Sequence, residues 1–127
     1  MARSPVHPAP EQIELPMLLD CLSDPTRLVV VYRLAQLGPG ESELQCGNFN
    51  AIGAKSNLTY HFARLREAGL IRTRVEGTGR YISLRRNDLE TRFPGLLDSI
   101  LKAAARDAVC VELAGCGRAA AEGKKKR

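Results

Sequence analysis

Cysteine and histidine are the residues of this 127-residue chain that could hold a soft metal or react with an oxidant. Its four cysteines and two histidines are Cys21, Cys46, Cys110, Cys116, His7 and His61. Separate helices could bring Cys21, Cys46 and Cys110 together as a three-thiolate site. The ligand of such a site would be a metalloid or Cu(I). Cysteine is also commonly buried as a small apolar residue, an interpretation that we favour but leave open beside the first.

A second set of polar side chains has the chemistry that DNA recognition needs. Leu58, Phe62 and Leu65 recur at helical spacing, which predicts a helix with one apolar face over residues 56–68. The opposite face carries amide, hydroxyl, phenol and guanidinium groups, which suit base edges and phosphates. The residues predicted to bind DNA at or beside this face are Lys55, Ser56, Asn57, Thr59, Tyr60, His61 and Arg64. The alternative is a polar face that is only solvated.

The next segment has the alternation of a β-hairpin. From residue 71 to residue 84, apolar residues alternate with polar ones on either side of a glycine-containing turn. We expect Arg74, Thr78 and Arg80 to bring this hairpin to the minor groove or the DNA backbone. Residues 55–86 hold eight basic and two acidic residues, a net charge of +6 in a chain with a net charge of +5. This concentration favours DNA binding over arginines that only protect an edge strand.

Two segments of the chain resemble a known family in the same order. Residues 56–71 read SNLTYHFARLREAGLI, which resembles the recognition helix of the ArsR/SmtB family of bacterial repressors. Residues 22–28 read LSDPTRL, which is similar to that family's Asp-Pro-Thr-Arg entry to its second helix. The resemblance covers roughly residues 15–110. It implies a winged helix-turn-helix homodimer that represses transcription at an inverted-repeat operator and is released by an unknown signal.

The sensor motifs of that family are only partly present. Its metalloid site is a Cys-x-Cys on the third helix, whereas the matching segment 43–47 holds the single thiol of Cys46. Its zinc-type site on the last helix uses Asp and His, and neither histidine lies there, so no such site is expected. A thiol sensor of metalloids, Cu(I) or oxidants would therefore use Cys21 and Cys110, with Cys46 as a third ligand. Cys116 falls in the fraying end of the last helix.

Capping residues and helix breakers predict where the other helices begin and end. A first helix begins between residues 11 and 22, and Asp24 caps a second helix with Pro25 at its first position. Residues 41–54 are expected to hold a short, irregular third helix. The caps expected farther along the chain are Ser56 and Gly69 for the DNA-binding helix, and Asn87 for the turn after the hairpin.

The last helix, which Pro94 interrupts, carries a coiled-coil-like apolar stripe that ends before Gly115. A long helix beyond the hairpin has little of its own chain left to cover, and the resemblance implies that it pairs with a second copy. The residues predicted to form this dimer contact, with the first helix, are Leu18, Leu97, Leu101, Ala104 and Ala108.

The predicted fold is mainly α with a small β-hairpin, a winged helix-turn-helix that dimerises through its N- and C-terminal helices. We expect a flexible arm at 1–12, the domain at 13–114 and a disordered basic tail at 115–127. Neither a spanning apolar run nor a signal pattern is present, which predicts a cytoplasmic protein. The chain has no nucleophile elbow, phosphate loop or paired carboxylates, so an enzyme is not expected. The predicted partner is double-stranded DNA; a winged-helix module that binds protein is the alternative of another class.

Overall fold

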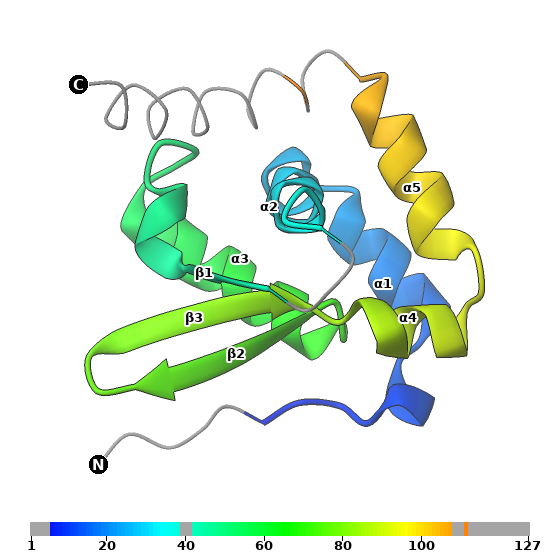
Figure 1. Cartoon of the computed structure of the whole chain (residues 1–127), viewed down its shortest axis with the longest axis horizontal. Coiled ribbons are helices and arrows are strands. Elements are labelled where there is room, and N and C mark those ends of the chain that lie inside the picture. Colours follow the sequence, from blue (N-terminus) through cyan, green and yellow to red (C-terminus); the bar gives the residue numbers. More distant parts are fainter. Residues whose placement is uncertain (1–5, 39–41, 108–110, 112–127) are drawn as a thin grey trace.

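A computed structural model describes residues 6–38, 42–107 and 111 of the chain (Figure 1). In this part of the chain, helices pack against one face of a small antiparallel sheet. The elements are η1 (Pro10–Gln12), α1 (Leu15–Leu22), α2 (Pro25–Ala35), β1 (Glu43–Gln45), η2 (Cys46–Phe49), α3 (Lys55–Glu67), β2 (Ile71–Glu76), β3 (Gly79–Leu84), α4 (Arg86–Arg92) and α5 (Leu96–Ala105). A mainly helical domain with a hairpin after α3 is a winged helix, so the predicted fold of the single chain is confirmed.

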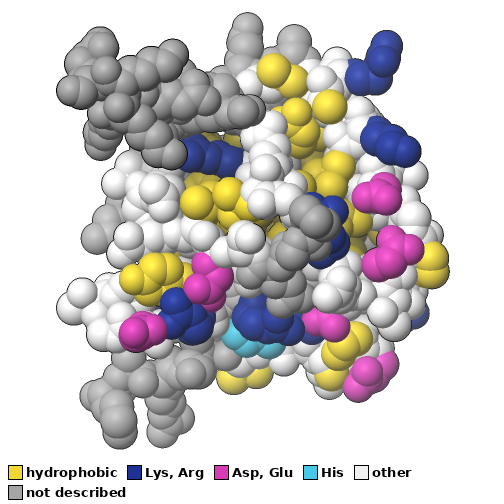
Figure 2. All heavy atoms as spheres, in the orientation of Figure 1, with side chains coloured by type: hydrophobic (Ala, Val, Ile, Leu, Met, Phe, Trp, Pro, Cys, Tyr) yellow, Lys and Arg dark blue, Asp and Glu magenta, His cyan; other side chains and the backbone are white. Residues whose placement is uncertain are grey.

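The sheet contains one more strand than the sequence predicts. β2 and β3 form the expected hairpin, with register from Ile71↔Leu84 to Glu76↔Gly79. β1 pairs antiparallel with the other edge of β3, which gives the strand order β1-β3-β2. On the face seen in Figure 2, basic and acidic side chains lie side by side over the hairpin.

The expected third helix is only partly present. Residues 43–45, where the family resemblance places helix, are strand β1, and the short helix that follows is the 3-10 helix η2. Gly47 and Asn48 inside η2 are poor α-helix formers, which agrees with the expectation of a short, irregular element. Phe49 at its end is fully buried and packs edge-on against Phe62 of α3, with ring centroids 5.6 Å apart. This contact fixes η2 against α3.

The two helices that flank this segment begin and end at defined residues. Asp24 caps α2 as predicted, because its side chain accepts hydrogen bonds from the Thr26 and Arg27 backbone N–H groups at 2.8 and 3.2 Å. α3 begins at Lys55 with Ala54 as its N-cap, so the prediction of Ser56 as the cap is wrong. Gly69 ends α3 as predicted, with a left-handed φ of 88°.

The core lies between α1, α2, α3 and the inner face of the sheet. Leu58 and Leu65 of α3 are fully buried and Phe62 is half-buried, which confirms the predicted apolar face of this helix. The inward residues of the hairpin, such as Ile71 and Ile82, are also fully buried.

The helices after the hairpin are separate, as Pro94 predicts. α4 ends at Arg92 and α5 begins at Leu96 after Gly95, whose φ is 81°. The N-cap of α4 is Arg85 and not Asn87. Ala108, Cys110, Cys116 and the predicted tail 115–127 lie outside the described residues. None of the helices in the described part of the chain combines the length and apolar character that crossing a membrane requires.

Most of the predicted dimer stripe packs within a single chain. Leu18, Leu97 and Ala104 are 2%, 5% and 3% exposed, and Leu101 is half-buried. Leu18 of α1 and Leu97 of α5 line the same small apolar pocket. The expectation that the last helix has little of its own chain to cover is therefore wrong, because α5 packs against α2 and α4. The exposed leucines of α1 are Leu15 and Leu19.

The N-terminal segment also packs against the hairpin. The Nε2 atom of His7 accepts a hydrogen bond from the Thr73 backbone N–H at 2.9 Å. The guanidinium of Arg85 donates to the Pro8 carbonyl at 2.8 Å. Where the sequence predicts a flexible arm over residues 1–12, the structure thus places His7 at the outer edge of β2 and Pro8 beside Arg85.

Candidate nucleic-acid interface

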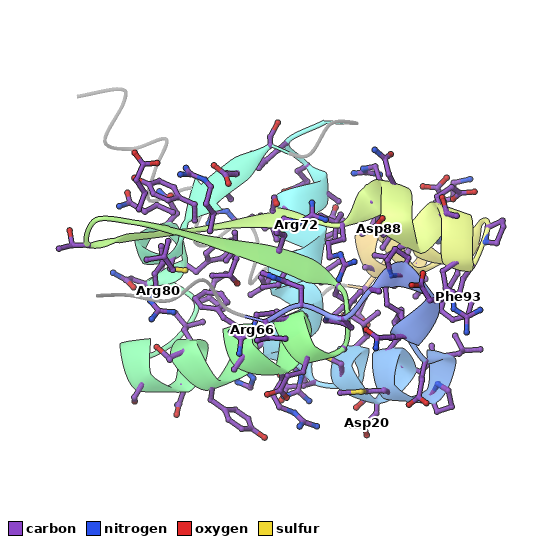
Figure 3. All side chains as sticks on the ribbon, turned by 90° about the horizontal axis from the view of Figure 1, so that it is seen from below. Asp20, Arg66, Arg72, Arg80, Asp88 and Phe93 are labelled. Carbon is purple, nitrogen blue, oxygen red and sulfur yellow. The ribbon has the colours of Figure 1, made fainter. Side chains whose placement is uncertain are left out.

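The exposed face of α3 carries the polar side chains that the sequence singled out. Ser56, Asn57, Thr59 and Tyr60 are exposed, and the Tyr60 side chain is the most prominent apolar surface of this face at 58% exposure. Figure 3 shows α3 with the hairpin on one of its sides and its other side turned away from the sheet. The first two turns of α3 thus present amide, hydroxyl and phenol groups on one surface. Lys55 begins this helix.

His61 and Arg64 have partners within the chain. The Nη1 atom of Arg27 lies 3.2 Å from Nδ1 of the half-buried His61. Because a guanidinium only donates, Nδ1 of His61 is the acceptor in this contact. Arg64 lies 3.5 Å from Glu67 in an exposed ion pair. Both side chains are therefore less available to DNA than those of the first two turns.

Arg27 is a positioning residue that the sequence analysis did not identify. It is 9% exposed, and its Nε donates to the Cys21 carbonyl at 2.7 Å. The side chain thereby joins the end of α1 to His61 of α3. Its place in the Asp-Pro-Thr-Arg segment was the only signal, because an arginine at the start of a helix is ordinarily exposed.

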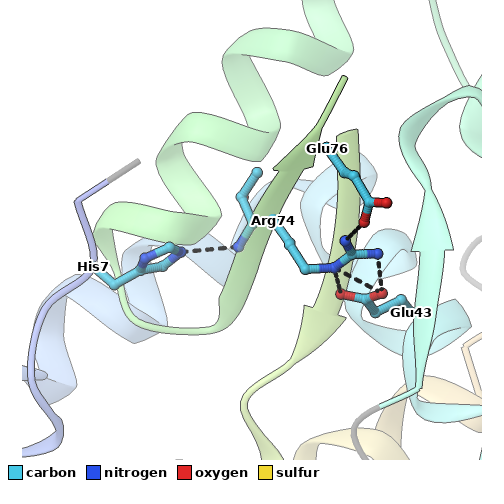
Figure 4. A network of polar contacts seen from close by, with 5 residues as sticks. His7, Glu43, Arg74 and Glu76 are labelled. Carbon is cyan, nitrogen blue, oxygen red and sulfur yellow. Dashed lines mark hydrogen bonds and ion pairs between the residues drawn. The ribbon is translucent and has the colours of Figure 1, made fainter. Parts of the chain in front are cut away.

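The outer face of the hairpin holds Arg74 in a network of carboxylates (Figure 4). Arg74 reaches across β3 to Glu43 of β1 at 2.9 Å, and it also pairs with Glu76. Its guanidinium lies over the Tyr81 ring, 4.6 Å from the centroid. The hydrogen bonds from Arg74 hold the pKa of Glu43 below its usual value. The guanidinium of Arg74 is therefore already paired with carboxylates, which makes it less available to bind a DNA phosphate.

The tip of the hairpin is arranged differently. Thr78 and Arg80 are exposed, and Arg80 has no hydrogen bond or ion pair through its side chain to another described residue. Arg80 pairs in register with Val75, so it lies on the same sheet face as Thr73 and Ile82, toward α3. In Figure 3, Arg80 lies in the space between the hairpin and α3, on the side where α3 begins. The start of α3 and the hairpin tip thus form one surface.

Part of the positive charge counted in residues 55–86 is not on this surface. Arg85 is 3% exposed and pairs with Asp88 at 2.9 Å, while Arg86 donates to the Ala35 carbonyl. Arg72 pairs with the same Asp88 at 3.3 Å. The net charge of this segment therefore overstates the charge that DNA would meet.

The two described cysteines are a buried thiol and a half-buried one, Cys21 and Cys46, neither in a disulfide. Burial raises the pKa of both thiols. Their thiolate fraction near neutral pH is therefore small, which slows metal binding and oxidation. Among the described residues no group of three His, Cys, Asp or Glu side chains could hold a metal ion. The third predicted ligand, Cys110, lies outside the described residues.

Comparisons with known proteins agree with this arrangement. No protein-family model matches the sequence. The chain is 38% identical over 88 residues to the uncharacterized HTH-type transcriptional regulator YceK of Bacillus subtilis (strain 168). The aligned region covers 65% of this chain and 82% of that protein. The exposed polar helix, the hairpin beside it and this relationship together show that the chain belongs to the HTH-type transcriptional regulators.

Proposed function

We propose that this protein is a repressor of the ArsR/SmtB type that binds an inverted-repeat operator as a homodimer and is released by a chemical signal. The resemblance of residues 22–28 and 56–71 to that family supports the repressor role. The strand at 43–45 is a departure from the family pattern. A repressor of this kind acts in the bacterial cytoplasm, where the DNA lies.

The observation that carries the proposal is the exposed polar face at the start of α3. Asn57 offers an amide that can bond a base edge with two hydrogen bonds, and Tyr60 offers an aromatic ring with a hydroxyl. Arg80 at the hairpin tip supplies a positive charge for a phosphate on the same side. Lys55, Ser56, Thr59 and Thr78 complete the proposed interface, with Arg64, His61 and Arg74 at its edge or behind it.

Selection from a random duplex library tests this function directly. We expect the selected duplexes to share an inverted repeat, because a two-fold dimer presents two α3 helices about one helical turn apart. Binding should weaken steeply when salt is raised, since phosphate contacts release counterions. A library that shows no enrichment, with protein partners captured instead, would favour the protein-binding module.

For the homodimer we propose the exposed part of α1 as the contact, together with α5. Leu15 and Leu19 lie one helical turn apart and are 38% and 47% exposed, and Leu101 of α5 is half-buried. Apolar surface of this kind on a small domain is suited to burial against a second copy. This set replaces the buried Leu18, Leu97 and Ala104.

Leu19→Asp should therefore dissociate the dimer, as measured by sedimentation, and should weaken operator binding. The circular dichroism spectrum should stay unchanged, because the fold of the single chain is kept. Leu37→Asp is the matched control, because Leu37 is 39% exposed at the end of α2. A Leu19→Asp protein that remains dimeric would rule out this contact.

A further inference from the structure

A cavity of about 620 Å³ lies between α3 and the hairpin, and the β1–η2 segment closes its third side. The residues that line it are Gln45, Cys46, Gly47, Asn50, Leu58, Thr59, Phe62, Ala63, Arg66, Thr73, Thr78, Gly79 and Arg80. Its volume is within the range of sites that bind small molecules.

Two of the lining residues, Thr73 and Arg66, each carry a buried polar atom that has no hydrogen-bond partner among the described residues. Thr73 is 6% exposed, and its buried Oγ1 has no partner. The Nε atom of Arg66 is likewise buried and without a partner. Both groups can donate, and a buried donor without an acceptor costs free energy. A ligand that brings acceptor oxygens to these groups would recover that cost.

The charge and the walls of the cavity further restrict the ligand. Arg66 and Arg80 are its charged lining residues, and none of the described lining residues is Asp or Glu. Figure 3 shows Arg66 and Arg80 directed into the space between α3 and the hairpin. Leu58, Phe62 and Ala63 of α3 give the cavity an apolar wall. This combination fits a molecule with an anionic group and an apolar body.

We propose that the cavity binds a small organic anion, a carboxylate or a phosphate ester on an apolar body, and that its binding displaces DNA. Thr59, Thr78 and Arg80 line the cavity and also belong to the proposed DNA interface. A bound anion would neutralise Arg66 and Arg80 and place negative charge beside the DNA phosphates. The displacement of DNA rests on the proposed function, whereas the binding of the anion does not.

Binding is tested on the full-length protein without DNA. Benzoate and phenyl phosphate serve as the two anionic probes, and benzamide serves as the neutral probe of similar shape. Titrations followed by ¹H–¹⁵N NMR should show saturable shifts for residues of the cavity with one or both anions. The more tightly bound anion identifies the acid class of the ligand. Benzamide binding as tight as that of either anion would overturn the proposal.

Two substitutions test whether the unpartnered donors hold the probe. Thr73→Val keeps the side-chain shape and should weaken binding about fivefold, and Arg66→Gln should weaken it about twentyfold. Thr73→Val should leave the thermal midpoint equal or higher, because it removes a buried unpartnered hydroxyl. The controls are Thr91→Val and Arg106→Gln, which change exposed residues of the same types away from the cavity. Equal effects of the test and control substitutions would contradict the assignment.

A competition experiment then separates the two parts of the proposal. Saturating the cavity with the better anionic probe should lower the affinity for a selected duplex about fivefold or more. If the probe binds but the affinity for DNA is unchanged, the proposed displacement of DNA is wrong, whereas the proposed anion site is supported. If the probes do not bind but Arg66→Gln weakens DNA binding, then a DNA phosphate occupies the cavity. The proposal that a small organic anion binds there is then wrong. A protein that binds probe but no duplex would refute the proposed function alone.

Discussion

The arginines of the hairpin differ in the partners that hold them. Arg72 and Arg74 face away from α3 and pair with Asp88, Glu43 and Glu76, whereas Arg80 faces α3 at the hairpin tip. DNA would have to compete with carboxylates for the first two, but not for Arg80. A charge count along the sequence cannot distinguish these cases, because the acidic partners come from β1 and α4.

Arg80→Ala should therefore lower the affinity of the protein for specific and for random duplexes by a similar factor. It should also reduce the slope of log affinity against log salt by about one. Arg74→Ala should reduce this slope less, because its charge is already balanced by Glu43 and Glu76. Anisotropy titrations over a range of salt concentrations measure both slopes. A larger effect of Arg74→Ala would mean that the carboxylates release it when DNA binds.

The Glu43–Arg74 pair links β1 to β2, and its contribution to the stability of the fold should depend on pH. Arg74 lowers the pKa of Glu43 in the folded chain, so the folded state binds a proton less readily than the unfolded state. The contribution of the pair to stability is thus present above the unfolded pKa and is lost as pH falls through the lowered folded value. Wild type should exceed Glu43→Gln in thermal midpoint at neutral pH, and this difference should shrink as the pH falls below the ordinary pKa of a glutamate.

Glu11→Gln is the control for this experiment, because Glu11 is an exposed carboxylate on η1. A difference between wild type and Glu43→Gln that persists unchanged in acid would contradict a role for the Glu43 charge.

At the scale of elements, the end of α3 is a tightly constrained junction. Gly69 has a φ of 88°, its N–H donates to the Arg66 carbonyl, and the Leu70 N–H donates to the Leu65 carbonyl. A Cβ added at Gly69 would lie 2.5 Å from Cγ1 of Ile13. Both the backbone conformation and the close packing thus require glycine between α3 and β2.

Gly69→Ala should lower the free energy of unfolding by about 2–4 kcal/mol, the combined cost of a left-handed non-glycine residue and overpacking. Urea unfolding measures it. Gly77→Ala at the hairpin turn is the control, since its φ is 60° but a Cβ there meets nothing within 4 Å. Equal costs at the two glycines would show that the contact with Ile13 is unimportant.

The elements that could be predicted are those with a long periodic signal or a local cap. The apolar repeat of α3, the alternation of β2 and β3, and the Asp24-Pro25 start of α2 all lie within a few residues of one another. β1 could not be predicted, because three residues show no periodicity and its pairing depends on the edge of β3. The N-cap of α3 was misplaced by two residues, since no side chain caps that end.

At the scale of the molecule, predictions that depended on distant contacts were the weakest. The polar face of α3 follows from helix geometry alone, and the structure exposes Asn57 and Tyr60 as expected. The prediction of the dimer stripe took Leu97 and Ala104 as free for a second copy, because sequence cannot show that α1 and α2 already cover them. The cavity between α3 and the hairpin is also a product of tertiary packing, and Arg66 gave no sequence signal of its own.

The central claim is that the exposed face of α3 reads DNA sequence. Its most direct test is the ratio of affinities for a selected and a scrambled duplex, measured by anisotropy at one fixed salt concentration. Asn57→Ala and Tyr60→Ala should each lower the free-energy difference between the two duplexes by about 1–3 kcal/mol. Asn87→Ala on α4 should leave that difference unchanged. An unchanged ratio in both α3 variants, with wild-type affinity for both duplexes, would contradict the claim.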